Sequence, residues 1–250
     1  MQIIVNNLDT EYTDNGAGAT ILLLHGWGTN ARSFSSLTNI LSSNNRCISL
    51  SLPGFGKSEN PPKAWAVEDY AAFVRQFLIK LDIDNPDVLI GHSFGGRIAV
   101  KAVATLKISP KKLVLIASAG LAEETKHAYL ATGIIKIGKI VTSIPPFSIA
   151  RNTLKRVMRR ARASKDYTEA GALKDTFVNV VNEHLGTDAK KVRTPTLLIW
   201  GKEDAETPLT EANAFKQSIP NSELCIIPNA GHFVFQEQSR TVARAIKHFL

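Results

Sequence analysis

The chain has 250 residues, of which 44% are hydrophobic and 21% charged, with a formal net charge of +8. This length suits one domain with an insertion, and the composition is typical of a globular protein that folds in water. No run of 18 uncharged apolar residues occurs and the first residues carry no basic, apolar leader pattern, so we expect neither a transmembrane helix nor a signal peptide. Cys47 and Cys225 lie far apart in or beside apolar runs, which predicts free thiols and a cytoplasmic location.

Short apolar runs predict the strands, in chain order near residues 3–5, 20–24, 46–51, 87–91, 112–117, 196–200 and 223–227. Apolar residues at helical spacing predict helices near residues 32–43, 67–82, 94–106, 208–218 and 237–250. Strands that alternate with helices indicate an α/β fold with a doubly wound, mostly parallel sheet.

The alternation stops between residues 120 and 190, where helical patterns follow one another without a convincing strand. Strands 112–117 and 196–200 are separated by far more chain than one crossover needs. We therefore expect residues 1–119 and 191–250 to form the sheet domain, and residues 120–190 to form a helical insertion.

Residues 88–95 read Val-Leu-Ile-Gly-His-Ser-Phe-Gly, which places G-x-S-x-G between a strand and a helix. The turn is tight enough to strain Ser93, and the glycines on either side leave room for it. The serine hydroxyl would stand above a helix N-terminus, where N–H groups suit a developing oxyanion. His92, the variable residue of the motif, is expected to point into packed surroundings.

A nucleophilic serine needs a base, and the base needs an orienting acid. Asp204 follows the strand at 196–200, and His232 follows the strand at 223–227. Because the carboxyl ends of parallel strands meet at one edge of a sheet, Ser93, Asp204 and His232 are expected to gather there. Glu203 and Glu206 compete with Asp204, whose shorter carboxylate can be held more rigidly against an imidazole.

The sequence His25-Gly26-Trp27-Gly28 follows the strand at 20–24, and its glycines allow the backbone to aim N–H groups at the serine. With these motifs, the chain resembles the α/β-hydrolase family over nearly its whole length. The resemblance implies that the first strand lies at an antiparallel edge, that the insertion is a cap over the site, and that His25 braces its loop. It also implies a catalytic triad of Ser93, Asp204 and His232. The backbone N–H groups of Trp27 and Phe94 would form the oxyanion hole.

Residues 151–165 contain seven basic residues and no acid, which leaves about +1 for the rest of the chain. Their apolar residues recur at helical spacing, so the segment predicts an amphipathic helix with a basic face. This face is either simply solvated or a docking site, centred on Arg156, Arg159 and Arg160, for an anionic substrate, an acyl carrier protein or an anionic membrane surface. Pimeloyl-carrier-protein methyl ester esterases are similar in this charge and in the His-Gly-Trp-Gly sequence. Nucleic acid is not expected, since no aromatic residues interleave the charges.

The motifs together predict a serine hydrolase that cleaves a small carboxylic ester through an acyl-enzyme, with no metal or organic cofactor. Three alternatives stay open. Carbon–carbon bond hydrolases share the triad but usually have Asn where this chain has His92. An acyltransferase would look the same in sequence, and a ligand-binding receptor could retain a slow triad.

Overall fold

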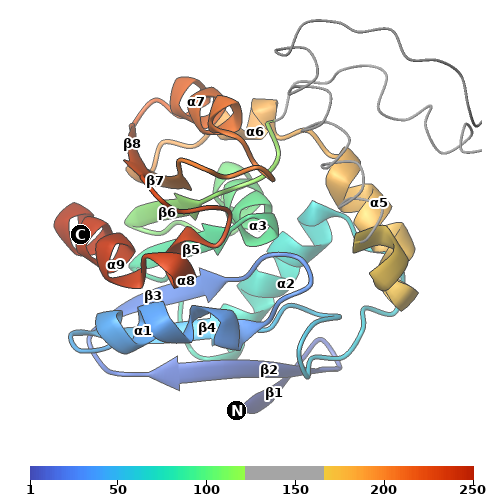
Figure 1. Cartoon of the computed structure of the whole chain (residues 1–250). Helices are drawn as coiled ribbons and strands as arrows, with labels where there is room; N and C mark the ends of the chain where they lie inside the picture. Colours follow the sequence, from blue (N-terminus) through green and yellow to red (C-terminus); the bar gives the residue numbers. More distant parts are fainter. Residues whose placement is uncertain (122–165) are drawn as a thin grey trace, which may run out of the picture.

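The computed structural model describes residues 1–121 and 166–250, and within them one eight-stranded sheet runs through the molecule (Figure 1). Its strand order is β1-β2-β4-β3-β5-β6-β7-β8. The strands are β1 (Gln2–Val5), β2 (Leu8–Asn15), β3 (Ala19–Leu24), β4 (Asn45–Leu50), β5 (Val88–His92), β6 (Lys112–Ile116), β7 (Thr196–Gly201) and β8 (Ser222–Ile227). Strands β3 to β8 pair in parallel, whereas β2 pairs antiparallel with β1 and β4. The predicted α/β fold and its antiparallel edge are both confirmed.

Helices cover both faces of the sheet (Figure 1). The first face packs against α1 (Ser35–Leu41), α8 (Val234–Glu237) and α9 (Ser239–Phe249). The second packs against α2 (Val67–Lys80), α3 (Phe94–Ala104) and α7 (Leu209–Ser218). One predicted helix, 32–43, is divided, because a 3₁₀ turn over Ala31–Phe34 precedes α1. The short helix α8, which precedes α9, was not predicted.

The central strands are apolar on both faces because both faces are covered. In β3, Leu22 and Leu24 point into the core beneath α2 and α3, whereas Ile21 and Leu23 point into the core beneath α1 and α9. This explains why the parallel strands are continuous apolar runs rather than alternating ones. The carboxyl ends of β5, β7 and β8 consequently meet at one edge of a rigid platform.

Strand β2 is the one described strand that the apolar runs did not predict. Its sequence, LDTEYTDN, is mostly polar. It forms because β1 and β4 supply backbone partners on both sides, and because Arg46 of β4 contacts the Asp14 carboxylate at 2.7 Å.

The described part of the expected insertion, residues 166–190, contains α5 (Lys174–Asn182) and α6 (Gly186–Ala189) and no strand. It is fixed to the sheet domain by polar contacts. The Trp65 backbone N–H donates to Thr176 Oγ1 at 3.1 Å, and Lys101 of α3 pairs with Glu183 at 2.8 Å and also with Asp188. The limits 120–190 stay a prediction, and Arg156, Arg159 and Arg160 lie outside the described residues.

No helix in the described ranges is long and apolar enough to cross a membrane.

Candidate active site

Ser93 lies in the turn between β5 and α3, with φ +50° and ψ −107°. A positive φ is costly for a residue with a side chain and is found mainly where the surrounding structure enforces it, often at functional sites. Two bonds enforce it here: the Ser93 N–H donates to the Ile116 carbonyl at 3.1 Å, and the Ser93 carbonyl accepts from the Ala119 N–H at 3.3 Å. Ser93 is only half-buried, so its hydroxyl is held at the edge of the sheet with access to solvent.

The glycines of the turn are required by close packing. A Cβ on Gly95 would lie 2.0 Å from the Leu24 carbonyl oxygen, and one on Gly91 would lie 2.5 Å from the Gly95 carbonyl oxygen. Both distances are far inside van der Waals contact, so neither position accepts a larger residue without movement of α3. Helix α3 can therefore begin directly behind Ser93.

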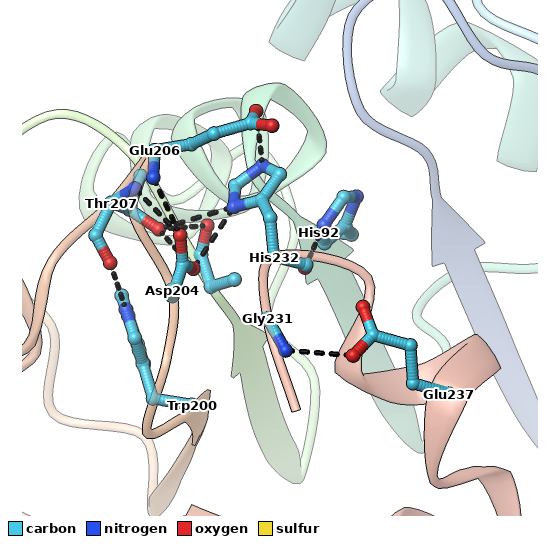
Figure 2. A network of polar contacts seen from close by, with 9 residues as sticks. His92, Trp200, Asp204, Glu206, Thr207, Gly231, His232 and Glu237 are labelled. Carbon is cyan, nitrogen blue, oxygen red and sulfur yellow. Dashed lines mark hydrogen bonds and ion pairs between the residues drawn. The ribbon is translucent and has the colours of Figure 1, made fainter. Parts of the chain in front are cut away.

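Asp204 and His232 are brought together at the ends of β7 and β8 (Figure 2). Asp204 Oδ2 lies 3.0 Å from His232 Nδ1, and the two residues are only 6% and 8% exposed. Neutral His232 can therefore donate its Nδ1 proton to Asp204, which leaves Nε2 as the basic nitrogen. No hydrogen bond among the described residues joins the Ser93 hydroxyl to His232.

The Asp204 carboxylate is fully bonded. Its Oδ1 accepts the backbone N–H groups of Glu206 at 2.8 Å and Thr207 at 2.9 Å, and its Oδ2 lies 2.8 Å from Thr207 Oγ1 (Figure 2). Burial raises the pKa of Asp204, but the bonds from His232 and Thr207 outweigh burial and lower it below its usual value. The carboxylate is thus held ionised beside the imidazole.

The two competing acids have different positions. Glu203 Oε2 accepts the backbone N–H of Ala230 at 3.0 Å, so it ties the Asp204 loop to the His232 loop. Glu206 Oε2 lies 3.5 Å from His232 Nε2, on the opposite side of the ring from Asp204 (Figure 2). Of the three acids, Asp204 is therefore the one that contacts Nδ1.

The loop after β3 packs directly on the serine turn. A Cβ on Gly26 would lie 3.4 Å from Ser93 Cβ. The Phe94 N–H is the first of α3, and the N–H of a first helical residue has no acceptor within its helix. Neither this N–H nor that of Trp27 donates to another group in the described ranges. Both predicted oxyanion-hole residues thus lie close to Ser93, Trp27 in the loop after β3 and Phe94 at the start of α3, and their backbone N–H groups remain available.

His25 braces this loop, as predicted. Its Nε2 accepts the Leu52 N–H at 2.9 Å, and its Nδ1 lies 2.7 Å from the Gly26 carbonyl oxygen, to which it donates. The residue is fully buried, and burial lowers its pKa to about 4. His25 therefore stays neutral and structural at ordinary pH.

Aromatic side chains form one wall beside the serine turn. The Trp27 ring makes edge contacts with Phe55, Phe94 and Phe177, at centroid distances of 4.9, 5.3 and 5.0 Å. Phe177 belongs to α5, so the described part of the expected insertion contributes to this wall.

Sequence reasoning missed the role of Thr207. Its position three residues after Asp204 could have indicated this role, because an Asp side chain commonly accepts the backbone N–H groups two and three residues further along the chain. Within residues 1–121 and 166–250, no three His, Cys, Asp or Glu side chains gather in a way that could hold a metal ion.

The family model described as "Alpha/beta hydrolase family" matches residues 21–245. The chain belongs to this family. This α/β hydrolase is 25% identical over 268 aligned residues to a 2-hydroxy-6-oxo-2,4-heptadienoate hydrolase of Pseudomonas putida, with 99% of this chain and 95% of the relative covered.

Solved structures agree with this α/β hydrolase in fold. A thermophilic esterase from Thermogutta terrifontis superposes with a TM-score of 0.76 at 20% identity, covering 100% of this chain and 97% of that one. A meta-cleavage product hydrolase from Pseudomonas fluorescens superposes with a TM-score of 0.74 at 20% identity, covering 100% and 96%. The family and its relatives together indicate a hydrolase.

Proposed function

We propose that this α/β hydrolase is a serine hydrolase that cleaves carboxylic esters through an acyl-enzyme. The observation that carries the proposal is the buried Asp204–His232 pair, 3.0 Å apart, at the sheet edge where Ser93 has a positive φ. His232 Nε2 takes the proton of Ser93 as its oxygen attacks the ester carbonyl, and Asp204 stabilises the imidazolium that results.

The N–H groups of Trp27 and Phe94 hold the oxyanion of the tetrahedral intermediate. The intermediate collapses as His232 returns the proton to the leaving alcohol, and an acyl-Ser93 ester remains. Water then loses a proton to His232 and attacks the acyl-enzyme. His232 returns that proton to the Ser93 oxygen as the acid leaves, which restores free Ser93. The aromatic wall around Trp27 favours an apolar acyl group, because rings at these distances offer apolar surface beside the oxyanion hole.

A panel of nitrophenyl esters that vary in acyl length and terminal charge tests this proposal. We expect turnover of several apolar acyl esters, with kcat/KM dependent on chain length because the acyl group lies against the aromatic wall. Absence of turnover for every ester in the panel would overturn it.

Carbon–carbon bond hydrolysis is the second candidate, and the Pseudomonas putida dienoate hydrolase is the observation that favours it. The same serine, histidine and acid would act on a ketone flanked by a conjugated chain. A comparison of kcat/KM for a 2-hydroxy-6-oxo-dienoate and for the best nitrophenyl ester separates the two. We expect a higher kcat/KM for the ester. A higher kcat/KM for the dienoate would make carbon–carbon bond hydrolysis the leading function.

Acyl transfer and ligand binding remain different outcomes for the same residues. Addition of an alcohol acceptor, followed by analysis of products, separates transfer from hydrolysis. A receptor with a slow triad would bind ligand but turn over esters at a rate near that of the uncatalysed reaction.

The proposal extends to location and partners, for which composition gives the support. The free thiols of Cys47 and Cys225 support a reducing, cytoplasmic setting. The basic residues of segment 151–165 support a substrate or carrier protein with negative charge, since their charge makes up nearly all of the net +8.

A further inference from the structure

His92 belongs to the serine turn and contacts two further segments of the candidate site, the loop after β3 (the oxyanion loop) and the loop of His232 (the histidine loop). It directly precedes Ser93, it is 1% exposed, and its ring lies 4.8 Å from the ring of His232, between centroids. The rings of Phe233 and Phe235 lie 5.3 and 4.7 Å away. The side chain is therefore enclosed between the serine turn and the histidine loop.

The bonding of His92 fixes its protonation state. Nε2 lies 3.0 Å from the backbone carbonyl oxygen of His232 (Figure 2). A carbonyl oxygen only accepts, so Nε2 carries the proton and donates it. Burial, and then the proximity of His232, hold the pKa of His92 well below its usual value. The ring is thus neutral, and Nδ1 carries a lone pair.

The other nitrogen of His92 faces the oxyanion loop. Nδ1 is buried and makes no hydrogen bond within the described residues. A Cβ on Gly26 would lie only 2.8 Å from it. The imidazole therefore sets how closely the Gly26–Trp27 backbone can approach Ser93, and Gly26 is the residue that permits this approach.

Three side chains, those of Glu203, Glu237 and His92, hold the backbone of the histidine loop. Glu203 accepts the Ala230 N–H at 3.0 Å, and Glu237 accepts the Gly231 N–H at 2.7 Å. His92 completes the series by donating to the carbonyl of His232 itself. Of these three side chains, His92 is the one in the serine turn. Its hydrogen bond therefore fixes the position of the base, His232, relative to the nucleophile, Ser93.

We propose that His92 is a positioning residue, whose Nε2–H holds the His232 backbone at a fixed distance from Ser93 while its ring supports the oxyanion loop. It acts through the His232 backbone and the oxyanion loop rather than on the substrate. The proposal rests on the proposed function for its kinetic consequence. A displacement of about 1 Å at a reacting group can cost on the order of 100-fold in rate, so one lost anchor should reduce kcat rather than binding.

Three variants separate the hydrogen bond from packing. His92→Phe keeps a ring and loses the donor. His92→Gln keeps an amide N–H at the same number of bonds from Cα. Phe235→Leu disturbs the same packed cluster without touching the bond. With the best nitrophenyl ester, we expect His92→Phe to lower kcat roughly 10- to 100-fold with KM changed less than about 3-fold. His92→Gln should recover most of the loss, and Phe235→Leu should keep near wild-type kcat.

The second measurement needs no turnover. In the wild type, the proton shared by His232 Nδ1 and Asp204 should give a downfield NMR signal, which should persist in His92→Gln and broaden or vanish in His92→Phe. A folded His92→Phe protein with a sharp wild-type signal would overturn the proposal, as would equal kcat losses in His92→Phe and Phe235→Leu. Failure of the wild type to cleave any ester would overturn the proposed function alone, because the signal still reports on His92.

Discussion

Two carboxylates contact the His232 imidazole, one at each nitrogen, and they differ in how firmly they are held. The side chain of Asp204 is fully buried at Nδ1, whereas that of Glu206 is 36% exposed at Nε2. A general base needs its orienting acid on the nitrogen that does not react. The geometry therefore favours Asp204 as the acid, although its neighbour is also within ion-pair distance.

Ser93→Ala should lower kcat/KM for the best ester by roughly 10⁴- to 10⁶-fold, because the acyl-enzyme cannot form. The fold should persist, since the hydroxyl makes no hydrogen bond in the described ranges. Steady-state kinetics and thermal unfolding check both statements. A variant with near-normal turnover would remove Ser93 from the mechanism.

Asp204→Asn should lower kcat by roughly 10⁴-fold, because a neutral amide does not stabilise the imidazolium and can select the wrong tautomer. Glu203→Gln and Glu206→Gln are the matched controls, and each should stay within about 10-fold of the wild type. Glutamine at position 203 keeps a carbonyl oxygen that can accept the Ala230 N–H. If either control were the more damaging variant, the acid would be assigned to that residue.

The serine turn depends on how closely α3 approaches β3. A Cβ at position 95 would lie 2.0 Å from backbone, whereas one at Gly231 would lie no nearer than 3.5 Å to the Glu237 carboxylate. Gly95→Ala should therefore lower the free energy of unfolding by about 3 kcal/mol, the upper end for overpacking, and Gly231→Ala should change it little. Denaturant titrations measure both. Equal stabilities would mean that α3 can shift without cost.

The elements that could be predicted from sequence are those that a continuous apolar run marks in the sequence itself. Strands β3, β5, β6 and β7 are continuous apolar runs because helices cover both faces. The polar edge strand β2 was missed because its stability comes from partners that are distant in sequence, such as Arg46.

The same distinction holds in the site. Ser93, Asp204 and His232 occupy positions marked by strand ends and glycines, so this pattern and the family resemblance together selected them. The bond from His92 to the His232 carbonyl spans 140 residues of sequence. Nothing local to either residue indicates such a bond, and only the folded sheet brings the two loops together.

At the scale of the molecule, buried neutral histidines make stability depend on pH. His25 and His92 both have lowered pKa values, that of His25 about 4. Below their usual pKa of about 6.5, the unfolded chain binds protons that the folded chain does not. The free energy of unfolding should therefore fall as pH drops from about 6.5 towards 4, by up to about 1.4 kcal/mol per pH unit for each histidine.

Urea titrations at pH 7, 6 and 5 check this slope. The pKa of Asp204 is lowered from its usual value of 3.8. As pH falls below 3.8, the free energy of unfolding should therefore decrease further, because the Asp204 carboxylate stabilises the fold only while it is ionised. His92→Phe should make the slope between pH 7 and 5 shallower, whereas replacement of the exposed His248 by Gln should not. An identical slope in the wild type and His92→Phe would contradict the account.

The uneven charge of the chain gives a prediction about substrates. Replacement of Arg156, Arg159 and Arg160 by Gln should raise KM for anionic or carrier-linked esters and leave neutral short esters nearly unchanged. The anionic substrates should also lose affinity as salt rises, since exposed charges are screened within about 8 Å at physiological ionic strength. The matched control removes three charges from the exposed face of α9, at Arg240, Arg244 and Lys247. Equal effects of both triple variants on every substrate would indicate that the basic segment is only solvated.

The role of Ser93 as the nucleophile can be tested by reaction of the whole chain with a fluorophosphonate, followed by mass spectrometry of its peptides. We expect one stable adduct, on Ser93, formed quickly in the wild type, far more slowly in Asp204→Asn, and not at all in Ser93→Ala. A wild-type protein that stays unlabelled, or that is labelled at a residue other than Ser93, would contradict it.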